Sequence, residues 1–459
     1  MQKLTDEIKT ILLQKIGERF VSFDAERREA YDFDGTDMRC LPDVVVEPES
    51  AEQVSSLLAI ASEFGVPVIP RGTGTGLSGG SLAINGGIAL SLLRMNKILD
   101  IDNVNMIAIV QPGVINHHLH EALTERGLYY PPDPASYETS SIGGNIAEDA
   151  GGPHCFKYGT TRDYVLGMDV VLPNGKMIQT GVKTRKGVVG YDIHDLMIGS
   201  EGTLAVVTEA TLRLIPMPQS VITLMVFYPQ ISDVIHTLTA LMKKRIVPST
   251  MEFMDASCTE LVRDRIPFRI PQESEILLIL ELDGEEELIA RQVEDVGEVC
   301  LEQNAADVLL ADSSHKRKGI WDVRRQLRDI IKENMRFRLS EDVVVPIDRI
   351  PELVEGCGRI ASEYGLRNYN YGHVGDGNVH VYITSDEDSD DVRKKSAAAA
   401  EQIFGLALGL GGTISGEHGI GVSKKPFIGM ELSAESIRLQ KMIKNVFDPE
   451  NIMNPGKIF

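Results

Sequence analysis

The chain has 459 residues, of which 43% are hydrophobic and 25% charged, as expected of a globular protein with two or three domains. Its formal net charge of −21 gives a negative surface field, which argues against nucleic acid as a partner and against anionic lipid surfaces. No stretch reaches the roughly eighteen uninterrupted apolar residues of a transmembrane segment, and residues 1–20 lack the apolar core of a secretion signal. We therefore expect a cytoplasmic protein, peripheral to a membrane only through partner subunits.

The cysteines are scattered, odd in number and without a Cys-x-x-Cys pair. This spacing argues against a disulfide framework and against a thiolate-bound zinc or iron–sulfur site. We expect small core residues at these five positions, which are Cys40, Cys155, Cys258, Cys300 and Cys357.

The first half of the sequence predicts strands and helices in irregular alternation. A strand over residues 43–48 is followed by a helix that Ser50 caps and that ends near Phe64, and then by a second strand over residues 66–70. Further strands are predicted at residues 87–93, 106–111, 165–172 and 176–180, the last two joined by the Asn174-Gly175 turn.

A glycine-rich loop follows the second predicted strand, with five glycines between Arg71 and Gly80. Backbone N–H groups can converge on phosphate oxygens in such a loop, so the loop predicts a diphosphate ligand. Gly74, Gly76 and Gly79 satisfy G-x-G-x-x-G, but another strand follows instead of the helix that a dinucleotide fingerprint requires. The alternative is an ordinary glycine-rich turn.

The glycine-rich character fades near residues 216–218, where we place a boundary between domains 1–217 and 218–459. Beyond it, apolar strands such as residues 221–228 and 275–282 alternate with charged helices. The β-helix-β stretches 221–282 and 343–384 are candidates for an ancient duplication, without convincing sequence identity between them.

Two histidines flank a predicted hairpin in residues 371–382. A two-residue turn at Asp376-Gly377 would pair His373 with His380 and put both imidazoles on one face, with Cβ atoms about 5 Å apart. Such a pair can share a metal ion. The alternative is a pair of histidines hydrogen-bonded inside a sheet.

A third ligand is available in residues 416–419, where glycines flank Glu417 and His418. The glycines allow a close backbone approach, and the acid and the imidazole suit different tasks. Two histidines and one carboxylate would fit Zn²⁺, Mn²⁺ or Fe²⁺.

Four ordered segments, residues 71–80, 131–136, 141–152 and 199–209, resemble the FAD-binding domain of the vanillyl-alcohol-oxidase-type flavoproteins. The resemblance implies an α+β fold, with a two-subdomain FAD-binding domain followed by an α+β substrate (cap) domain with an antiparallel sheet, and a C-terminal segment that returns to the FAD. The residues that it assigns to FAD are Pro70, Arg71, Gly72, Thr73, Gly74, Thr75, Gly76, Ser78, Gly79, Gly80, Pro132, Asp133, Ser136, Ser141, Gly144, Asn145, Gly151, Gly152, Glu201, Gly202, Val206 and Asn454.

Relatives that attach flavin covalently carry a histidine in the diphosphate loop, and residues 71–80 contain none. We therefore expect non-covalent FAD. His154 and Cys155 are the alternative attachment points, in a segment that resembles one that glycolate-oxidase relatives carry without such a bond.

The segments around His373, His380 and Glu417, with residues 448–457, resemble the D-2-hydroxy-acid dehydrogenase and glycolate oxidase branch of the same flavoproteins. The resemblance implies that these three residues bind a divalent metal and that His418 is the general base. An imidazole suits that role because its ordinary pKa is about 6.5.

Arg324 stands in a Trp-x-x-Arg motif that, in this branch, places a guanidinium on the substrate carboxylate. The alternative is a solvated basic helix face, because Arg325 and Arg328 lie in the same stretch. No lysine clearly aligns with the one that relatives use for a second carboxylate. A monocarboxylate is therefore favoured, although Arg328 or Arg338 could substitute.

The resemblance predicts FAD-dependent oxidation of a small 2-hydroxy acid, with D-lactate or glycolate favoured, to the 2-oxo acid. Without a cysteine cluster, electrons must pass to an external acceptor such as electron-transfer flavoprotein, a quinone or an iron–sulfur subunit, so we expect an oligomer or complex. The alternatives are a metal-dependent hydrolase of a phosphorylated substrate and a non-catalytic flavin subunit of an oxidase complex.

Overall fold

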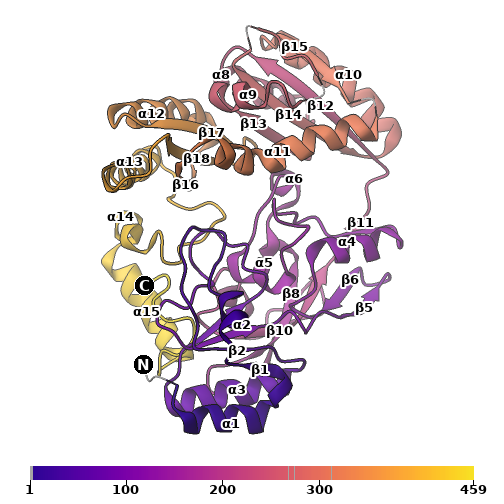
Figure 1. The fold of residues 1–459 in the computed structure, drawn as a ribbon. Coiled ribbons are helices and arrows are strands. Elements are labelled where there is room, and N and C mark those ends of the chain that lie inside the picture. Colours follow the sequence, from indigo (N-terminus) through magenta and orange to yellow (C-terminus); the bar gives the residue numbers. More distant parts are fainter. Residues whose placement is uncertain (1–3, 267, 273, 312) are drawn as a thin grey trace. The chain divides into compact units, whose positions relative to one another are not determined.

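The computed structural model describes residues 4–266, 268–272, 274–311 and 313–459, and the chain forms two compact units (Figure 1). Unit 1 consists of Met1–Gly151, Gly159–Met217 and Glu417–Phe459, and unit 2 of Gly152–Tyr158 and Pro218–Gly416. Two segments depart from a single division at residues 217/218, because residues 152–158 group with unit 2 and residues 417–459 with unit 1. Among the helices of the described residues, none is long and apolar enough to cross a membrane.

The first part of unit 1 is a four-stranded sheet of order β1-β2-β4-β3, in which β3 and β2 run parallel to β4. Ser50 caps α3 by accepting the Gln53 N–H at 3.4 Å, and Gly65 ends it in the left-handed conformation. The apolar face of α3 packs with α1 in one buried core. The elements are α1 Asp6–Ile16, β1 Val21–Ser22, α2 Ala25–Glu29, β2 Val44–Val46, α3 Ala51–Phe64, β3 Val68–Arg71 and β4 Ile88–Ser91.

The second part of unit 1 is a five-stranded antiparallel sheet of order β5-β6-β10-β8-β9. The C-terminal segment joins unit 1 along β3, where Val68 N–H donates to Ile452 O and Asn454 N–H to Val68 O, each at 2.8 Å. The elements are β5 Ile98–Asp102, β6 Ile107–Val110, α4 Asn116–Thr124, β7 Leu128–Tyr129, α5 Ile142–Glu148, β8 Val165–Val171, β9 Met177–Gly181, α7 Ile193–Met197, β10 Val206–Arg213, β11 Ile215–Pro216, α14 Ile428–Glu431 and α15 Ala434–Phe447.

Unit 2 is built on a seven-stranded antiparallel sheet of order β15-β12-β14-β13-β17-β18-β16. The predicted α+β class, with a two-part first domain followed by a domain built on an antiparallel sheet, is therefore confirmed. The elements are α6 Cys155–Tyr158, β12 Ser220–Tyr228, α8 Ile231–Lys243, β13 Thr250–Met254, α9 Ala256–Val262, β14 Ile276–Gly284, α10 Glu286–Glu302, β15 Asp307–Leu310, α11 Ser314–Asn334, β16 Phe337–Val344, α12 Ile350–Glu363, β17 Arg367–His373, β18 Asn378–Ser385 and α13 Asp390–Gly409.

The seven strands fall into two halves with the same topology. Strands β12, β13, β14 and β15 with helices α8 and α10 form a βαββαβ unit, and β16, α12, β17, β18 and α13 repeat its order. A bridge between Val344 and Thr413 stands where the second half would have its fourth strand. The halves join through β13 and β17, with Glu252 directly opposite His373. This shared topology supports the duplication that the sequence pattern raised.

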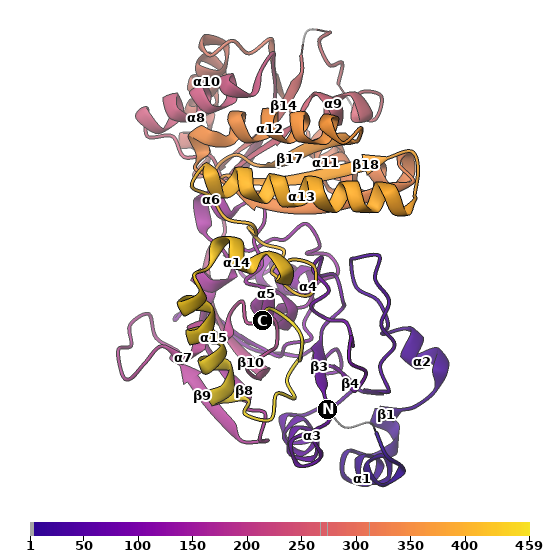
Figure 2. The same cartoon turned by 90° about the vertical axis from the view of Figure 1, so that its left-hand side faces the viewer.

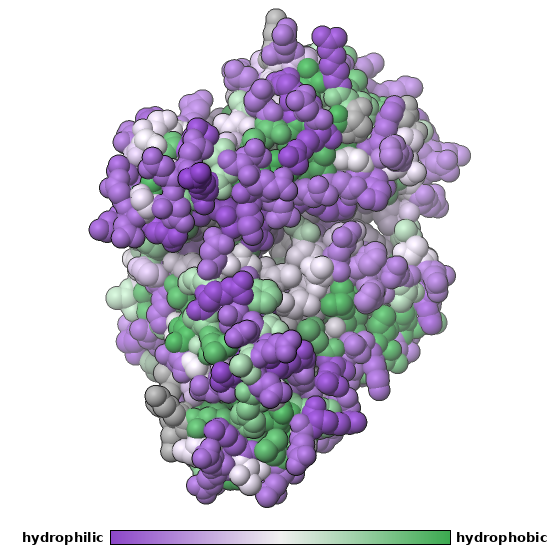
Figure 3. All heavy atoms as spheres, viewed as in Figure 1, coloured by the Kyte–Doolittle hydropathy of each residue, from purple (hydrophilic) through white to green (hydrophobic). Residues whose placement is uncertain are grey.

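Helices cover both faces of the unit 2 sheet. Helices α8, α10, α12 and α13 lie on one face, where α12 and α13 run side by side (Figure 2). Helices α9 and α11 lie on the other, which we call the site face, over an apolar core that includes Phe227, Ile279 and Trp321. The outer side of α11 is hydrophilic (Figure 3).

Candidate functional site

The two histidines of unit 2 approach each other, but not in the predicted register. The turn between β17 and β18 has four residues, 374–377, so His373 pairs with Asn378 and His380 with Tyr371. The predicted pairing of His373 with His380 across a two-residue turn is therefore wrong. Both side chains nevertheless lie on the site face as diagonal neighbours, with ring centroids 5.3 Å apart.

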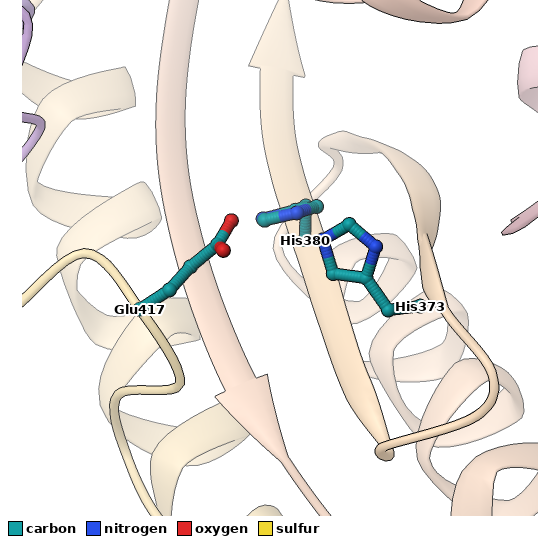
Figure 4. Close-up of side chains that lie close together, drawn as sticks. All are labelled: His373, His380 and Glu417. Carbon is teal, nitrogen blue, oxygen red and sulfur yellow. The ribbon is translucent and has the colours of Figure 1, made fainter. Parts of the chain in front are cut away.

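His373, His380 and Glu417 bring one ligand atom each to within 4.8 Å of one another (Figure 4). Both histidines are 6% exposed. One ring nitrogen of His373 points toward His380 and Glu417. Two imidazole nitrogens and one carboxylate oxygen form a donor set that could hold a divalent transition metal.

The backbone just before Glu417 is fixed to β16. Asp342, which is fully buried and opposite His380, accepts the Gly416 N–H at 2.7 Å. A Cβ on Gly416 would lie 2.0 Å from Asn378 Nδ2, so any larger residue here would have to displace this buried amide. The predicted role of a glycine beside Glu417 thus has a structural basis.

A buried carboxylate connects two of the predicted site residues. Glu252 on β13 is 0% exposed, its Oε1 contacts His373 Nδ1, and its Oε2 accepts from Arg324 Nε at 2.8 Å and forms an ion pair with Arg324 Nη2. Burial raises the pKa of the Glu252 carboxyl, but Arg324 and His373 outweigh burial and bring this pKa below its ordinary value. Glu252 is therefore a carboxylate.

Arg324 belongs to the buried side of α11 and not to a solvated face. Ser313 caps this helix, and the three-residue spacing directs Trp321 and Arg324 toward the sheet. Arg324 is 6% exposed, and its guanidinium lies 4.6 Å from the centre of the Tyr371 ring. Since Glu252 engages the Nε–Nη2 edge, a substrate carboxylate would have to meet the Nη1–Nη2 edge.

Sequence reasoning missed Glu252 and Asp342. Glu252 lies in a strand whose residues are all buried, and Asp342 lies in the buried part of β16, between Glu341 and Val343. An acid at a position that the strand pattern assigns to the core is a usable signal, because a buried charge requires partners. Their partners come from strands and loops remote in the sequence, which no local pattern reveals.

In unit 1, the glycine-rich loop runs between β3 and β4. Within the described residues, no backbone N–H from residues 73–78 donates a hydrogen bond to the protein. The six consecutive positions 73–78 thus form a loop whose donors suit an anion. The Arg71 side chain is buried, donates to Phe33 O at 2.5 Å, and lies over the rings of Tyr31 and Phe33. The Arg71 side chain therefore anchors the start of the loop to Tyr31 and Phe33.

The other segments predicted to bind the cofactor meet this loop. Ser141 caps α5, which carries Gly144 and Asn145, and a Cβ on Gly72 would lie 2.2 Å from Ser141 Oγ. A Cβ on Gly202 would lie 3.3 Å from Pro70. Gly151 is the last residue of the first segment of unit 1, and Gly152 is the first residue of unit 2. Val206 is the first residue of β10.

Pro132, Asp133 and Ser136 form a turn segment beside α4. Asn116 Nδ2 donates to Pro132 O at 3.0 Å, and Thr139 N–H donates to Ser136 O at 2.8 Å. Ile115 forms a bridge with Ser141, which connects this segment to α5. The four sequence segments therefore lie in unit 1, except for Gly152 at the end of the third segment, which groups with unit 2.

Asn454 ties two of these segments together. Its side-chain Nδ2 donates to Gly80 O at 2.8 Å and to Glu201 O at 2.7 Å. The Glu201 carboxylate accepts the N–H groups of Ile420 and Gly421 at 2.8 and 2.7 Å. Glu201 thus holds the C-terminal segment, which follows His418 closely.

Glu148 is a buried acid that sequence reasoning did not single out. A Cβ on Gly80 would lie 3.1 Å from its Oε1, and its Oε2 has no hydrogen-bond partner among the described residues. Burial raises the pKa of the Glu148 carboxyl well above its ordinary value, and the charges of Glu201 and Asp34 add to this effect. A protonated carboxyl beside the loop can donate a hydrogen bond to a ligand.

Residues 152–158 pack within unit 2. The Phe156 ring lies where a Cβ on Gly375 would be, 2.2 Å from its Cγ, and Tyr158 donates to Asp283 at 2.8 Å. Cys155 Sγ accepts the Gly152 N–H at 3.0 Å. The cysteines form no disulfide within the described residues, and Cys258, Cys300 and Cys357 are buried as predicted, whereas Cys40 and Cys155 are partly exposed.

Comparisons with known proteins agree with this organisation. A family model for an FAD-binding domain matches residues 42–181, and one described as FAD linked oxidases, C-terminal domain, matches residues 217–458. The chain is 39% identical to glycolate oxidase subunit GlcD of Bacillus subtilis (strain 168), over 99% of this chain and 97% of the relative. It is also 39% identical to a D-lactate dehydrogenase of Anaerostipes hadrus, over 91% and 89% of the two chains. The structure of p-cresol methylhydroxylase shares the fold, with a TM-score of 0.81, 17% identity and coverage of 99% and 96%.

Proposed function

This chain belongs to the FAD-linked oxidase family, and on that basis we propose that it oxidises a small 2-hydroxy acid to the 2-oxo acid, with D-lactate and glycolate favoured. The observation that carries the proposal is the cluster of His373, His380 and Glu417, with Arg324 joined to His373 through Glu252. The names of the two relatives supply the substrate class.

The first part of the proposal assigns FAD to unit 1, non-covalently because residues 71–80 contain no histidine. The N–H groups of residues 73–78 would hold the diphosphate, and the orphaned Oε2 of Glu148 offers a further polar contact. Bound FAD supplies the hydride acceptor for the reaction.

Replacing Asn454 with alanine is expected to weaken FAD binding about 10-fold. Its amide holds Gly80 O and Glu201 O, so its loss frees the loop at a cost of about 1.4 kcal/mol. Fluorescence titration of the apoprotein with FAD measures the change. Asn85→Ala is the matched control, because Asn85 also donates to the C-terminal segment, at Pro455 O, without touching the loop carbonyls. Equal FAD affinity of both variants would contradict this role.

The second part concerns the metal. The donor set of His373, His380 and Glu417 fits Zn²⁺, Mn²⁺ or Fe²⁺. Such an ion supplies a Lewis acid for the 2-hydroxyl group of the substrate.

The protein groups then divide the remaining work. Arg324 binds and orients the substrate carboxylate, and its burial excludes the water that would weaken this ion pair. His418 accepts the hydroxyl proton at a ring nitrogen as the C2 hydrogen departs with two electrons. The product is the 2-oxo acid.

The electrons must leave through an external acceptor. Among the described residues, the only group of metal-binding side chains is the one that contains Glu417, and it includes no cysteine. We propose electron-transfer flavoprotein, a quinone or an iron–sulfur subunit as the acceptor. The Bacillus relative is itself named as a subunit, which supports a complex.

Anaerobic mixing with 2-hydroxy acids tests this function. D-lactate or glycolate should bleach the flavin band at about 450 nm, whereas L-lactate and D-2-hydroxyglutarate should do so more slowly. The measurement with 2-hydroxyglutarate also tests whether Arg338 can bind a second carboxylate. Arg338 lies four residues before Asp342 and therefore on the same site face of β16. Rapid bleaching by 2-hydroxyglutarate would contradict the monocarboxylate preference. No bleaching by any 2-hydroxy acid would favour a non-catalytic flavin subunit, and a colourless protein after FAD addition would favour the hydrolase.

A further inference from the structure

The carboxylate of Glu252 sits where the two halves of the unit 2 sheet meet. Glu252 on β13 and His373 on β17 are cross-strand partners, so their side chains leave the same face side by side. Its two oxygens are divided between partners, with Oε1 on His373 Nδ1 and Oε2 on Arg324. One buried carboxylate therefore contacts a proposed metal ligand and the proposed substrate-binding arginine.

The contact with Nδ1 decides which nitrogen of His373 is available to a metal. A carboxylate accepts only, so Nδ1 carries the proton and donates. The lone pair of the neutral ring is then on Nε2, the nitrogen that faces His380 and Glu417 in Figure 4. The ring orientation and the tautomer are both those required of a ligand.

A second buried acid on the same face shows that burial alone does not explain this arrangement. Glu281 on β14 is also 0% exposed, and it accepts from Trp321 Nε1 at 2.7 Å and from Arg317 Nε at 3.0 Å. Its cross-strand partner on β13 is Thr250, two residues from Glu252. The two acids share environment and helix, but only Glu252 contacts a residue of the cluster.

We propose that Glu252 is the positioning residue of this site, fixing His373 for metal binding with one oxygen and the guanidinium of Arg324 with the other. The inference rests on the proposed function, because it assigns the metal to His373. It extends that function because a single side chain, Glu252, would set both the orientation of a metal ligand and the position of the guanidinium that binds the substrate carboxylate. Partners of this kind typically change metal affinity 10- to 100-fold.

The test is the metal affinity of the full-length, FAD-loaded protein after chelator treatment. Competition between the protein and a chromophoric chelator gives the Kd for Zn²⁺ and for Mn²⁺ without any turnover. Glu252→Gln is expected to weaken metal binding at least 10-fold, because the amide is a poorer acceptor for Nδ1–H and would turn its NH₂ group toward Arg324. Glu281→Gln is the matched control and should bind metal as the wild type does.

A second variant separates positioning from the effect of an unpaired charge. Glu252→Gln leaves the Arg324 cation buried, whereas the double variant E252Q/R324Q removes both charges. Metal binding should stay at least 10-fold weaker in the double variant if Glu252 acts through His373. Recovery of wild-type affinity in the double variant, or unchanged affinity in Glu252→Gln, would overturn the role.

Kinetics give an independent readout of the same carboxylate. Loss of positioning should lower kcat through the metal and raise KM through Arg324 in Glu252→Gln. A wild-type protein that binds neither metal would overturn the metal site and this role together. A wild type that binds metal beside an equally tight Glu252→Gln would overturn only the role of Glu252.

Discussion

Replacing His418 with alanine is expected to lower kcat by on the order of 10² or more while FAD remains bound. The substrate loses a proton and a hydride in one oxidation, and without the His418 imidazole the proton loses its proposed acceptor. Steady-state rates with an artificial electron acceptor and the flavin absorbance of the purified variant measure the two quantities. Added imidazole should restore part of the rate.

The control for this variant is His118→Ala, which removes an exposed imidazole from α4 in unit 1. It should retain wild-type kcat and flavin content. If His418→Ala turned over as fast as the wild type, the proton would have to go elsewhere, and His418 would lose its role as base. A variant that lost FAD instead would indicate a structural role for the residues that follow Glu417.

Replacing His380 with alanine is expected to reduce bound metal to a small fraction of one ion per flavin and to lower kcat by about 10² or more. The cluster has only two imidazoles and one carboxylate, so the variant retains two ligands from the set. Elemental analysis of the purified protein gives the metal content, and steady-state assays give the rate. Chelator treatment of the wild type should reproduce the loss, and the correct metal ion should reverse it.

His236→Ala provides the matched control, because His236 lies on α8 with 63% of its side chain exposed and takes no part in the cluster. It should keep both metal and rate. Full activity of His380→Ala, or of wild type shown to be metal-free, would remove the metal from the reaction. Arg324 and His418 would then have to account for substrate binding and proton removal alone.

Much of this site could be predicted because its signals are local. The spacing of His373 and His380 around a turn puts two imidazoles on one strand face in both the predicted and the observed register, since these differ by an even number of residues. The actual turn is four residues long, and Gly377 adopts a positive φ within it. A Cβ there would lie 2.0 Å from Val345 O, a constraint from the residue after β16 that the hairpin sequence does not contain.

The site residues that the sequence did not predict depend on contacts between distant segments. Glu252 precedes His373 by 121 residues, and only the pairing of β13 with β17 brings them together. Asp342 reaches the backbone before Glu417 by the same kind of long-range placement. Turn chemistry and hydrophobic periodicity specify elements, whereas strand order depends on the packing of the whole sheet.

The joint between the two halves of the unit 2 sheet also affects how the protein can fold and evolve. In an isolated half, β13 or β17 would be an edge strand with unpaired backbone groups. Such a strand can pair with another chain and cause aggregation. Because β13 and β17 pair with each other, both lie inside one continuous sheet, and only β15 and β16 are edge strands. A duplication of one half would therefore leave the outer strands β15 and β16 freer to change than the inner pair, whose two strands must keep shielding each other.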